Sequence, residues 1–253
     1  RAHGIEIATA AGCNSRGVLQ WVAAALKSAT ERNGSKPCDH RLGIVGVGNI
    51  GRLVEEYALR WGFEVVRCDP PRKRAEGGDF RSIDEVASTC DIITFHVPLI
   101  REGEDRTVHL ADEQFFSQLR PNTVILNASR GEVVDNEALS RAISEGRCSA
   151  YLDVWENEPQ INRTLLAQVV ASTPHIAGYS AQGKANATAM SVQTVARAFN
   201  LPLMDFYPTE VERVAPQTIE WADMCATIDR YCDLATESRA LREHPDHFEQ
   251  LRN

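Results

Sequence analysis

Short apolar runs alternate with amphipathic runs along most of the chain. The apolar runs have the length and composition of buried strands, and they cover residues 42–47, 64–69, 91–98, 123–127 and 150–154. The runs between them place apolar side chains at helical spacing, after residue 51 and over residues 82–89, 112–119 and 135–144. Strands that alternate with helices predict an α/β fold with a doubly wound parallel sheet and right-handed crossovers.

Local signals predict where several elements begin and end. Ser82 and Glu85 form the S-x-x-E pattern of a capping box at the start of a helix. A helix over residues 18–32 is expected to stop at Asn33-Gly34. We also expect a strand at Gly4–Ala8 and a turn followed by a charged loop over residues 70–79. Beyond a linker at residues 205–208, the pattern predicts one helix from Ile219 to Leu234 that needs a partner to cover it.

The stretch from Leu42 to Asp69 has the complete form of a dinucleotide-binding fingerprint. A strand runs into the glycine pattern of Gly46, Gly48 and Gly51, a helix follows, and a second strand ends in an acidic residue. Gly46 is expected to make the tight turn, Gly48 to leave room for the pyrophosphate, and Gly51 to let the helix pack closely on the sheet. The sequence therefore predicts a Rossmann-type domain.

The two ends of the predicted cofactor site have different chemistry. The helix that begins near Asn49 and Ile50 directs backbone N–H groups toward the pyrophosphate. Asp69 is placed to accept the ribose hydroxyls and would repel a 2′-phosphate, which favours NAD over NADP. Arg72 and its basic neighbours, just beyond Asp69, leave the strictness of that preference open.

Composition narrows the classes of protein that this chain can represent. The net charge of −8 gives no basic surface for nucleic acid or for an anionic membrane. Seven scattered cysteines without a C-x-x-C pair indicate neither a disulfide framework nor a metal site. A reducing cytoplasm fits this pattern best. The 253 residues supply ample material for a buried core.

Polar residues follow the later strands, at the edge where a parallel sheet binds its ligands. Together with a nicotinamide cofactor, they could catalyse the oxidation of a 2-hydroxy acid. Arg130 can bind a carboxylate in fork geometry. His175 can take the hydroxyl proton, and Glu158 can fix its tautomer and stabilise the imidazolium. Each residue also has an ordinary structural interpretation, as a surface arginine, a loop acid or a histidine in a turn. Among the other histidines, His96 is expected in the core and the His244/His247 pair in a solvated tail.

Four segments in this order resemble the D-isomer-specific 2-hydroxyacid dehydrogenases. They are the fingerprint and the segments 127–131 (Asn-Ala-Ser-Arg-Gly), 153–159 (Asp-Val-Trp-Glu-Asn-Glu-Pro) and 174–178 (Pro-His-Ile-Ala-Gly). Shorter segments at 12–14, 68–72, 78–82, 152–156 and 175–180 resemble the members that oxidise 4-phospho-D-erythronate with NAD, in the biosynthesis of pyridoxal 5′-phosphate. The resemblance runs from about Gly4 to the end of the chain.

This resemblance implies roles for individual residues. Arg130, Glu158 and His175 would be the catalytic residues, with Arg130 and Tyr179 binding the substrate. Val97 stands where many members have a small hydroxyl residue, so a side-chain hydrogen bond to the cofactor is lost there. The resemblance assigns no residue to the substrate phosphate, for which Lys184 is a candidate only by its position near the start of the helix after Tyr179. The residues expected to line NAD are Gly46, Gly48, Asn49, Ile50, Gly51, Asp69, Val97, Ala128, Ser129, Arg130, Asp153 and Gly178.

The resemblance also suggests a division of the chain. Residues 1–40 would be the end of a substrate lobe with a crossover helix, 41–177 the NAD-binding domain, 178–200 a return helix, and 201–253 part of a C-terminal dimerisation region. A homodimer is expected, and the chain is expected to be truncated and poorly active alone. Three alternatives stay open: a dehydrogenase of the phosphoglycerate or glyoxylate type, a non-catalytic NAD-binding module, and a corepressor-like NAD sensor.

Overall fold

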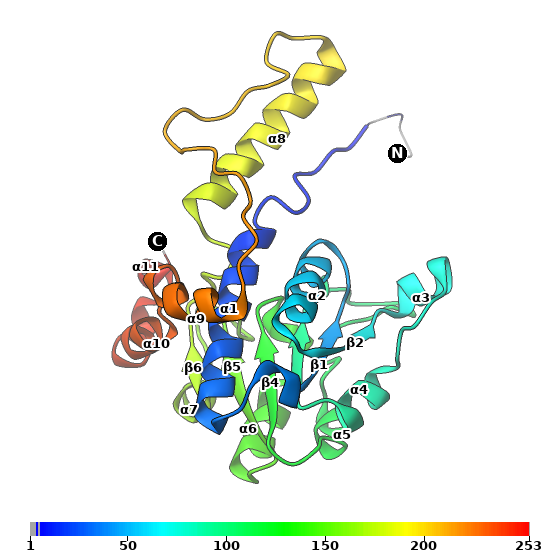
Figure 1. Ribbon diagram of the computed structural model, residues 1–253, viewed down its shortest axis with the longest axis vertical. Helices are drawn as coiled ribbons and strands as arrows, with labels where there is room; N and C mark the ends of the chain where they lie inside the picture. The colour runs from blue at the N-terminus through cyan, green and yellow to red at the C-terminus, as the bar shows by residue number, and fades with distance from the viewer. Residues whose placement is uncertain (1–3, 5, 253) are drawn as a thin grey trace.

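Six parallel strands form one sheet in the order β2-β1-β3-β4-β5-β6 (Figure 1). The computed structural model describes residues 4 and 6–252. The strands occupy the following residues: β1 Arg41–Val45, β2 Glu64–Cys68, β3 Ile92–Phe95, β4 Thr123–Asn127, β5 Cys148–Leu152 and β6 Ala171–Ser172. The predicted strands of the fingerprint and of the later βα units are thus confirmed. The chain leaves β1 toward β2 and then returns to β3 on the other side, so the strand order reverses between β1 and β3.

Helices cover both faces of this sheet, as a doubly wound fold requires. One face packs against α1 and α2, and the other against α4, α5, α6 and α7 (Figure 1). Their bounds are α1 Ser15–Asn33, α2 Asn49–Trp61, α4 Ile83–Thr89, α5 Glu113–Ser117, α6 Asn136–Ser144 and α7 Arg163–Gln168. Single 3-10 turns lie at η1 Pro37–Asp39 and η2 Gly131–Val133.

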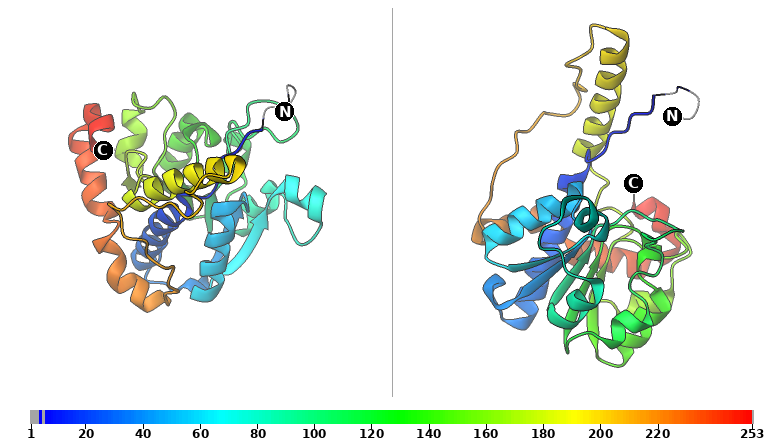
Figure 2. Two further views of the ribbon diagram at one scale, coloured as in Figure 1. Left: turned by 90° about the horizontal axis from the view of Figure 1, so that it is seen from above. Right: turned by 90° about the vertical axis from the view of Figure 1, so that its right-hand side faces the viewer.

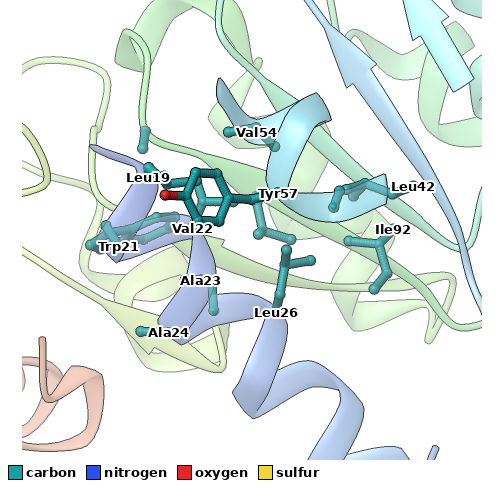
Figure 3. Close-up of a cluster of buried hydrophobic side chains, with 14 of the residues drawn as sticks. Leu19, Trp21, Val22, Ala23, Ala24, Leu26, Leu42, Val54, Tyr57 and Ile92 are labelled. Carbon is teal, nitrogen blue, oxygen red and sulfur yellow. The ribbon is translucent and has the colours of Figure 1, made fainter. Parts of the chain in front are cut away.

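Alternating side chains of the strands build the two halves of the core. Leu42 and Ile92 point toward α1 and α2, where they meet Leu26, Val54 and other buried side chains (Figure 3). The neighbouring strand residues belong to the cluster on the opposite face. Because the strands are buried on both faces, they read as continuous apolar runs in the sequence, which is why they were predictable.

The predicted helix ends are confirmed by their capping geometry. Ser82 Oγ accepts a hydrogen bond from Glu85 N at 3.1 Å, and the Glu85 carboxylate accepts one from Ser82 N at 2.8 Å. Asp112 and Asp135 cap α5 and α6 in the same way through their side chains. Gly34 ends α1 in the left-handed conformation.

Three predicted elements were wrong. Residue 4 and residues 6–8 form no strand, because no described strand lies beside them to pair, while residue 5 lies outside the described residues. The loop expected at residues 70–79 contains the helix α3 Pro70–Glu76, since Asp69 caps it and proline occupies its first turn. The long helix expected from Ile219 to Leu234 is broken, since its first part ends at Thr227 before a 3-10 turn and the Asp233 side chain then caps a new helix.

The C-terminal third of the chain leaves the domain and returns to it. Helix α8, Ala181–Phe199, projects beyond the sheet layers, and residues 200–220 run back to them (Figure 2). Tyr57 Oη and Trp61 Nε1 donate hydrogen bonds to backbone carbonyls of the returning segment, at 3.0 Å each. The remaining elements then pack on the domain: α9 Trp221–Thr227, η3 Ile228–Arg230, α10 Leu234–Glu243, η4 Pro245–His247 and α11 Phe248–Leu251. Of the described helices, none has the length and hydropathy needed to cross a membrane.

Candidate active site

The reversal of strand order between β1 and β3 places a glycine turn against the end of a neighbouring strand. Gly46 follows β1 with φ +88°. A Cβ atom added there would lie 2.6 Å from the carbonyl oxygen of His96 and 2.7 Å from Val97 Cγ1. Glycine is therefore required both by the backbone conformation and by the approach of the next strand. This is the topological switch point, where open α/β sheets bind their ligands.

The other two glycines of the fingerprint differ in what surrounds them. A Cβ atom at Gly51 would lie 2.0 Å from the Gly46 carbonyl oxygen, so glycine permits the close approach of α2 to the turn. At Gly48 nothing lies within 4 Å of a Cβ atom, and both Gly48 and Asn49 are exposed. The N-terminus of α2 therefore faces open space, with the polarity that a pyrophosphate needs.

Asp69 lies at the end of β2, beside the glycine turn. Its Oδ2 accepts a hydrogen bond from Val47 N at 2.8 Å, and its Oδ1 accepts one from Arg72 N at 3.0 Å. The Arg72 side chain donates to the Val47 carbonyl at 2.8 Å and also pairs with Glu76. The carboxylate is thus fixed by backbone donors, and its remaining lone pairs can accept hydroxyl groups.

His175 and Glu158 form a hydrogen-bonded pair beyond the ends of β5 and β6. The distance from His175 Nδ1 to Glu158 Oε2 is 2.7 Å, and both side chains are partly exposed. Glu158 Oε1 also accepts a hydrogen bond from Trp155 N at 2.8 Å, which fixes the carboxylate. With Nδ1 bonded to a carboxylate, Nε2 of a neutral imidazole carries the lone pair that can take a proton.

A buried carboxylate holds the turn that carries His175. Asp153 accepts hydrogen bonds from Thr173 Oγ1 at 2.6 Å, from Ile176 N at 2.8 Å and from Ala177 N at 3.0 Å. Its own carbonyl accepts from His175 N at 2.7 Å. Burial raises the pKa of Asp153, while the donors around it and the nearby His175 oppose this shift. Asp153 is only 1% exposed, so its carboxylate is enclosed by these donors.

Arg130 follows β4 and its side chain is exposed. Its Nη1 donates to the Ser129 carbonyl at 2.5 Å, and Ser129 and Ala128 themselves are buried. A Cβ atom at Gly131 would lie 1.9 Å from the Trp155 carbonyl oxygen, so the segment carrying Arg130 packs tightly on the loop carrying Glu158. Two of the predicted catalytic segments are therefore in direct contact.

A second carboxylate in that loop was not predicted from the sequence. Glu156 Oε2 accepts a hydrogen bond from Asn136 N at 2.9 Å, and Glu156 Oε1 lies 2.7 Å from His109 Nε2. Glu156 N donates in turn to Asn136 Oδ1 at 3.3 Å. These bonds join the loop of Glu158 to the start of α6 and to the segment before α5. The only signal in the sequence is that Glu156 lies two residues before Glu158.

The remaining predicted residues lie along the same edge. Val97 and Ile50 are partly buried beside the glycine turn. A Cβ atom at Gly178 would lie 2.4 Å from Asn14 Nδ2, so this glycine packs against the start of α1. Tyr179 is 37% exposed at the base of α8.

The prediction for the other histidines is confirmed for His96 and only partly correct for the tail. His96 is buried, as predicted, and burial lowers its pKa to about 3. Its Nε2 lies 3.0 Å from Thr94 Oγ1. His244 and His247 stack on each other at 5.6 Å between centroids, within a segment that docks on the domain through the buried Phe248. The described residues contain no group of three His, Cys, Asp or Glu side chains able to hold a metal.

Comparison with known proteins shows the family to which this chain belongs. Residues 14–177 match the family described as D-isomer specific 2-hydroxyacid dehydrogenase, NAD binding domain. The chain is 45% identical over 253 residues to erythronate-4-phosphate dehydrogenase of Bacteroides thetaiotaomicron, covering 98% of this chain and 72% of that protein. It is 46% identical over 187 residues to the Escherichia coli (strain ATCC 8739) protein of the same name, covering 73% of this chain and 50% of that protein.

Solved structures show the same fold. The TT0316 protein of Thermus thermophilus is 25% identical with a TM-score of 0.64, over 79% of this chain and 71% of that one. The NAD-dependent formate dehydrogenase of Staphylococcus aureus, solved in complex with NAD, has a TM-score of 0.64 at 23% identity, over 81% of this chain and 67% of that one. The chain belongs to the D-isomer-specific 2-hydroxyacid dehydrogenase family, and it is an NAD-dependent 2-hydroxyacid dehydrogenase.

Proposed function

We propose that this protein oxidises 4-phospho-D-erythronate to 3-hydroxy-2-oxo-4-phosphooxybutanoate, as a step in the biosynthesis of pyridoxal 5′-phosphate. The names of its relatives support this substrate. The observation that carries the proposal is the 2.7 Å bond between His175 and Glu158, in a loop that packs against the segment of Arg130. A base, its orienting acid and a carboxylate-binding cation are the groups that oxidation of a 2-hydroxy acid requires.

The hydrogen bonds of the site support a separate role for each side chain. Glu158 keeps the proton of the neutral imidazole on Nδ1, so His175 Nε2 takes the proton of the substrate hydroxyl. Glu158 then stabilises the imidazolium that forms. Arg130 binds the substrate carboxylate and polarises the developing carbonyl.

The residues around the glycine turn fit NAD. The exposed backbone at Gly48 and the N-terminus of α2 receive the pyrophosphate, and Asp69 accepts the ribose hydroxyls. Bound NAD supplies the acceptor for the hydride that leaves the substrate carbon. Asn49, Ile50, Val97 and the residues after β4 and β5 complete this side of the site.

A comparison of substrates tests the proposal. Steady-state rates with NAD would be measured on 4-phospho-D-erythronate and on 3-phospho-D-glycerate, together with glyoxylate reduction by NADH. We expect the highest kcat/KM with 4-phospho-D-erythronate. A higher value with either other substrate would assign the protein to a different member of the family and refute the proposal.

The protein also has a surface suited to a second copy of itself. Helix α8 and the residues after it leave Val195, Phe199, Leu201, Leu203 and Met204 exposed on a projection from the domain (Figure 2). We propose that this projection forms a homodimer interface, since exposed apolar side chains gathered on one element mark interaction sites. Sedimentation velocity of the Phe199→Asp variant is expected to show monomers. A monomeric wild type, or a dimeric variant, would count against this interface.

A further inference from the structure

Two cationic side chains from distant parts of the chain lie over one aromatic ring. Lys184 Nζ is 3.7 Å from the centroid of the Tyr179 ring, and the guanidinium carbon of Arg252 is 5.5 Å from it. Lys184 belongs to the first turn of α8, and Arg252 follows α11. Figures 1 and 2 show α11 beside the base of α8. The fold thus concentrates two positive charges at one point of a protein whose net charge is −8.

These two charges are not neutralised by carboxylates in the part of the chain that the structure describes. Neither Lys184 nor Arg252 forms an ion pair there, whereas Arg163 pairs with Asp246 at 2.5 Å. The Arg252 Nε atom is buried without a hydrogen-bond partner among the described residues. A buried donor without an acceptor is costly, so the described residues leave the guanidinium of Arg252 incompletely satisfied.

The ring that both cations contact is close in sequence to the proposed base. Tyr179 N donates a hydrogen bond to the Ile176 carbonyl at 2.8 Å, which closes a turn directly after His175. The same turn leads into α8 through the capping residue Ser180. The positive end of the α8 dipole therefore points toward the same region.

We propose that Lys184 and Arg252, held on the face of Tyr179, form the subsite for the phosphate of the substrate. This inference rests on the proposed function. A phosphate monoester carries a charge of about −1.5 to −2 near neutral pH and offers three acceptor oxygens. An ammonium and a guanidinium match that charge, and the planar guanidinium can bind two of the oxygens.

The placement also explains how one substrate can engage both ends of the site. Arg130 binds the carboxylate at one end of the short carbon chain, and His175 acts on the adjacent carbon. The phosphate at the other end then meets the two cations beyond the turn. A 2-hydroxy acid without the phosphate has no anionic group to pair with the two cations, so this subsite selects for phosphorylated substrates.

Substrate discrimination tests the subsite. The ratio of kcat/KM for 4-phospho-D-erythronate to kcat/KM for unphosphorylated D-erythronate would be measured in Lys184→Ala, Arg252→Ala and the double variant. We expect each single substitution to lower the ratio by about tenfold and the double substitution by about 100-fold, the range for charge-assisted hydrogen bonds. Lys184→Arg and Arg252→Lys are expected to retain most of it. The matched control is Lys36→Ala with Arg230→Ala, two exposed cations elsewhere, which is expected to leave the ratio unchanged.

A binding measurement separates the subsite from the proposed reaction. Inorganic phosphate would be titrated into the protein and followed by ³¹P NMR, with melting temperatures checking that the variants are folded. Binding by the wild type that is lost in the folded double variant supports the subsite, even if 4-phospho-D-erythronate is not oxidised and the proposed function fails. Oxidation of that substrate with an unchanged ratio in the double variant overturns the subsite alone. The absence of both phosphate binding and turnover overturns both.

Discussion

Substitution of Gly51 by alanine sets two effects of opposite sign against each other. Alanine is favoured over glycine inside a helix by about 1 kcal/mol, which would stabilise α2. The added Cβ atom, however, would lie 2.0 Å from the Gly46 carbonyl oxygen and 3.0 Å from its carbon. Ordinary van der Waals contact needs about 3.5 Å, so helix and turn must separate by more than about 1 Å.

The steric effect is expected to win. Overpacking costs about 1–3 kcal/mol in a well-packed core, and the cost here should lie in the upper part of that range, about 2–3 kcal/mol, because the atom opposed belongs to the backbone and cannot swing aside like a side chain. Subtraction of the helix preference of about 1 kcal/mol leaves an expected loss in the free energy of unfolding of about 1–2 kcal/mol for Gly51→Ala. For a chain of this size the melting temperature should fall by about 2–8 °C. The displaced turn should also weaken NAD binding.

Gly48→Ala is the matched control, because nothing lies within 4 Å of a Cβ atom there and φ is −84°. Thermal melting without cofactor should show little change for this variant, while fluorescence titration should show weaker NAD binding, since the added methyl group occupies the approach of the pyrophosphate. A Gly51→Ala protein that melts at or above the wild-type temperature and binds NAD normally would refute the packing argument. Normal NAD binding by Gly48→Ala would refute the position of the pyrophosphate.

Three further predictions concern charge and proton transfer. The unfolded chain protonates His96 near its ordinary pKa of about 6.5, whereas burial holds the folded-state pKa at about 3. The stabilising effect of the neutral, buried His96 should therefore be complete above pH 6.5, and the free energy of unfolding should fall below that pH by up to about 1.4 kcal/mol per pH unit. Urea unfolding of His96→Gln should lack this slope. Equal slopes in both proteins would contradict the burial argument. Asp69→Ser should reduce the preference for NAD over NADP in fluorescence titrations. A wild-type protein that binds NADP more tightly than NAD would contradict the role proposed for this carboxylate. His175→Ala should lower kcat by at least about 100-fold while NAD affinity stays within a few-fold of the wild type. Glu158→Gln should lower kcat by less. A normal rate in His175→Ala would exclude His175 as the base.

The elements that were predictable from the sequence are those specified by their own residues. The capping box at Ser82 and the apolar strands buried on both faces carry local signals that tertiary contacts do not override. One error occurred where a single residue acts in two ways. Asp69 follows a strand and also caps α3, so the two prolines after it begin a helix where a turn was expected. The helix expected up to Leu234 ends instead at Thr227, and Asp233 caps a new helix after it, so the apolar spacing continued across a break in the backbone.

The candidate site was predictable to the extent that the fold specifies it. Parallel strands bring their carboxyl ends to one edge, so Glu158 and His175 could be paired from topology alone, and the structure places them 2.7 Å apart. The bonds of Glu156 to His109 and Asn136 join residues 47 and 20 positions apart through loops. Loops lack the regular spacing of apolar residues that reveals helices and strands. The sequence therefore gives no local pattern that indicates which side chains such loops bring together.

The backbone conformation of His175, the proposed base, indicates what the buried carboxylate of Asp153 does. His175 has φ +59°, a left-handed conformation that is unfavourable for a residue with a side chain. Such a residue persists only where surrounding bonds determine it. Here the carbonyl of Asp153 accepts from His175 N, and its carboxylate accepts from the next two backbone N–H groups. Because burial alone disfavours this charge, as its raised pKa reflects, these two N–H groups and the Thr173 hydroxyl must compensate the carboxylate for the lost water. We therefore interpret Asp153 as the group that fixes the direction of the His175 ring, so a role toward the cofactor would come in addition to this structural one.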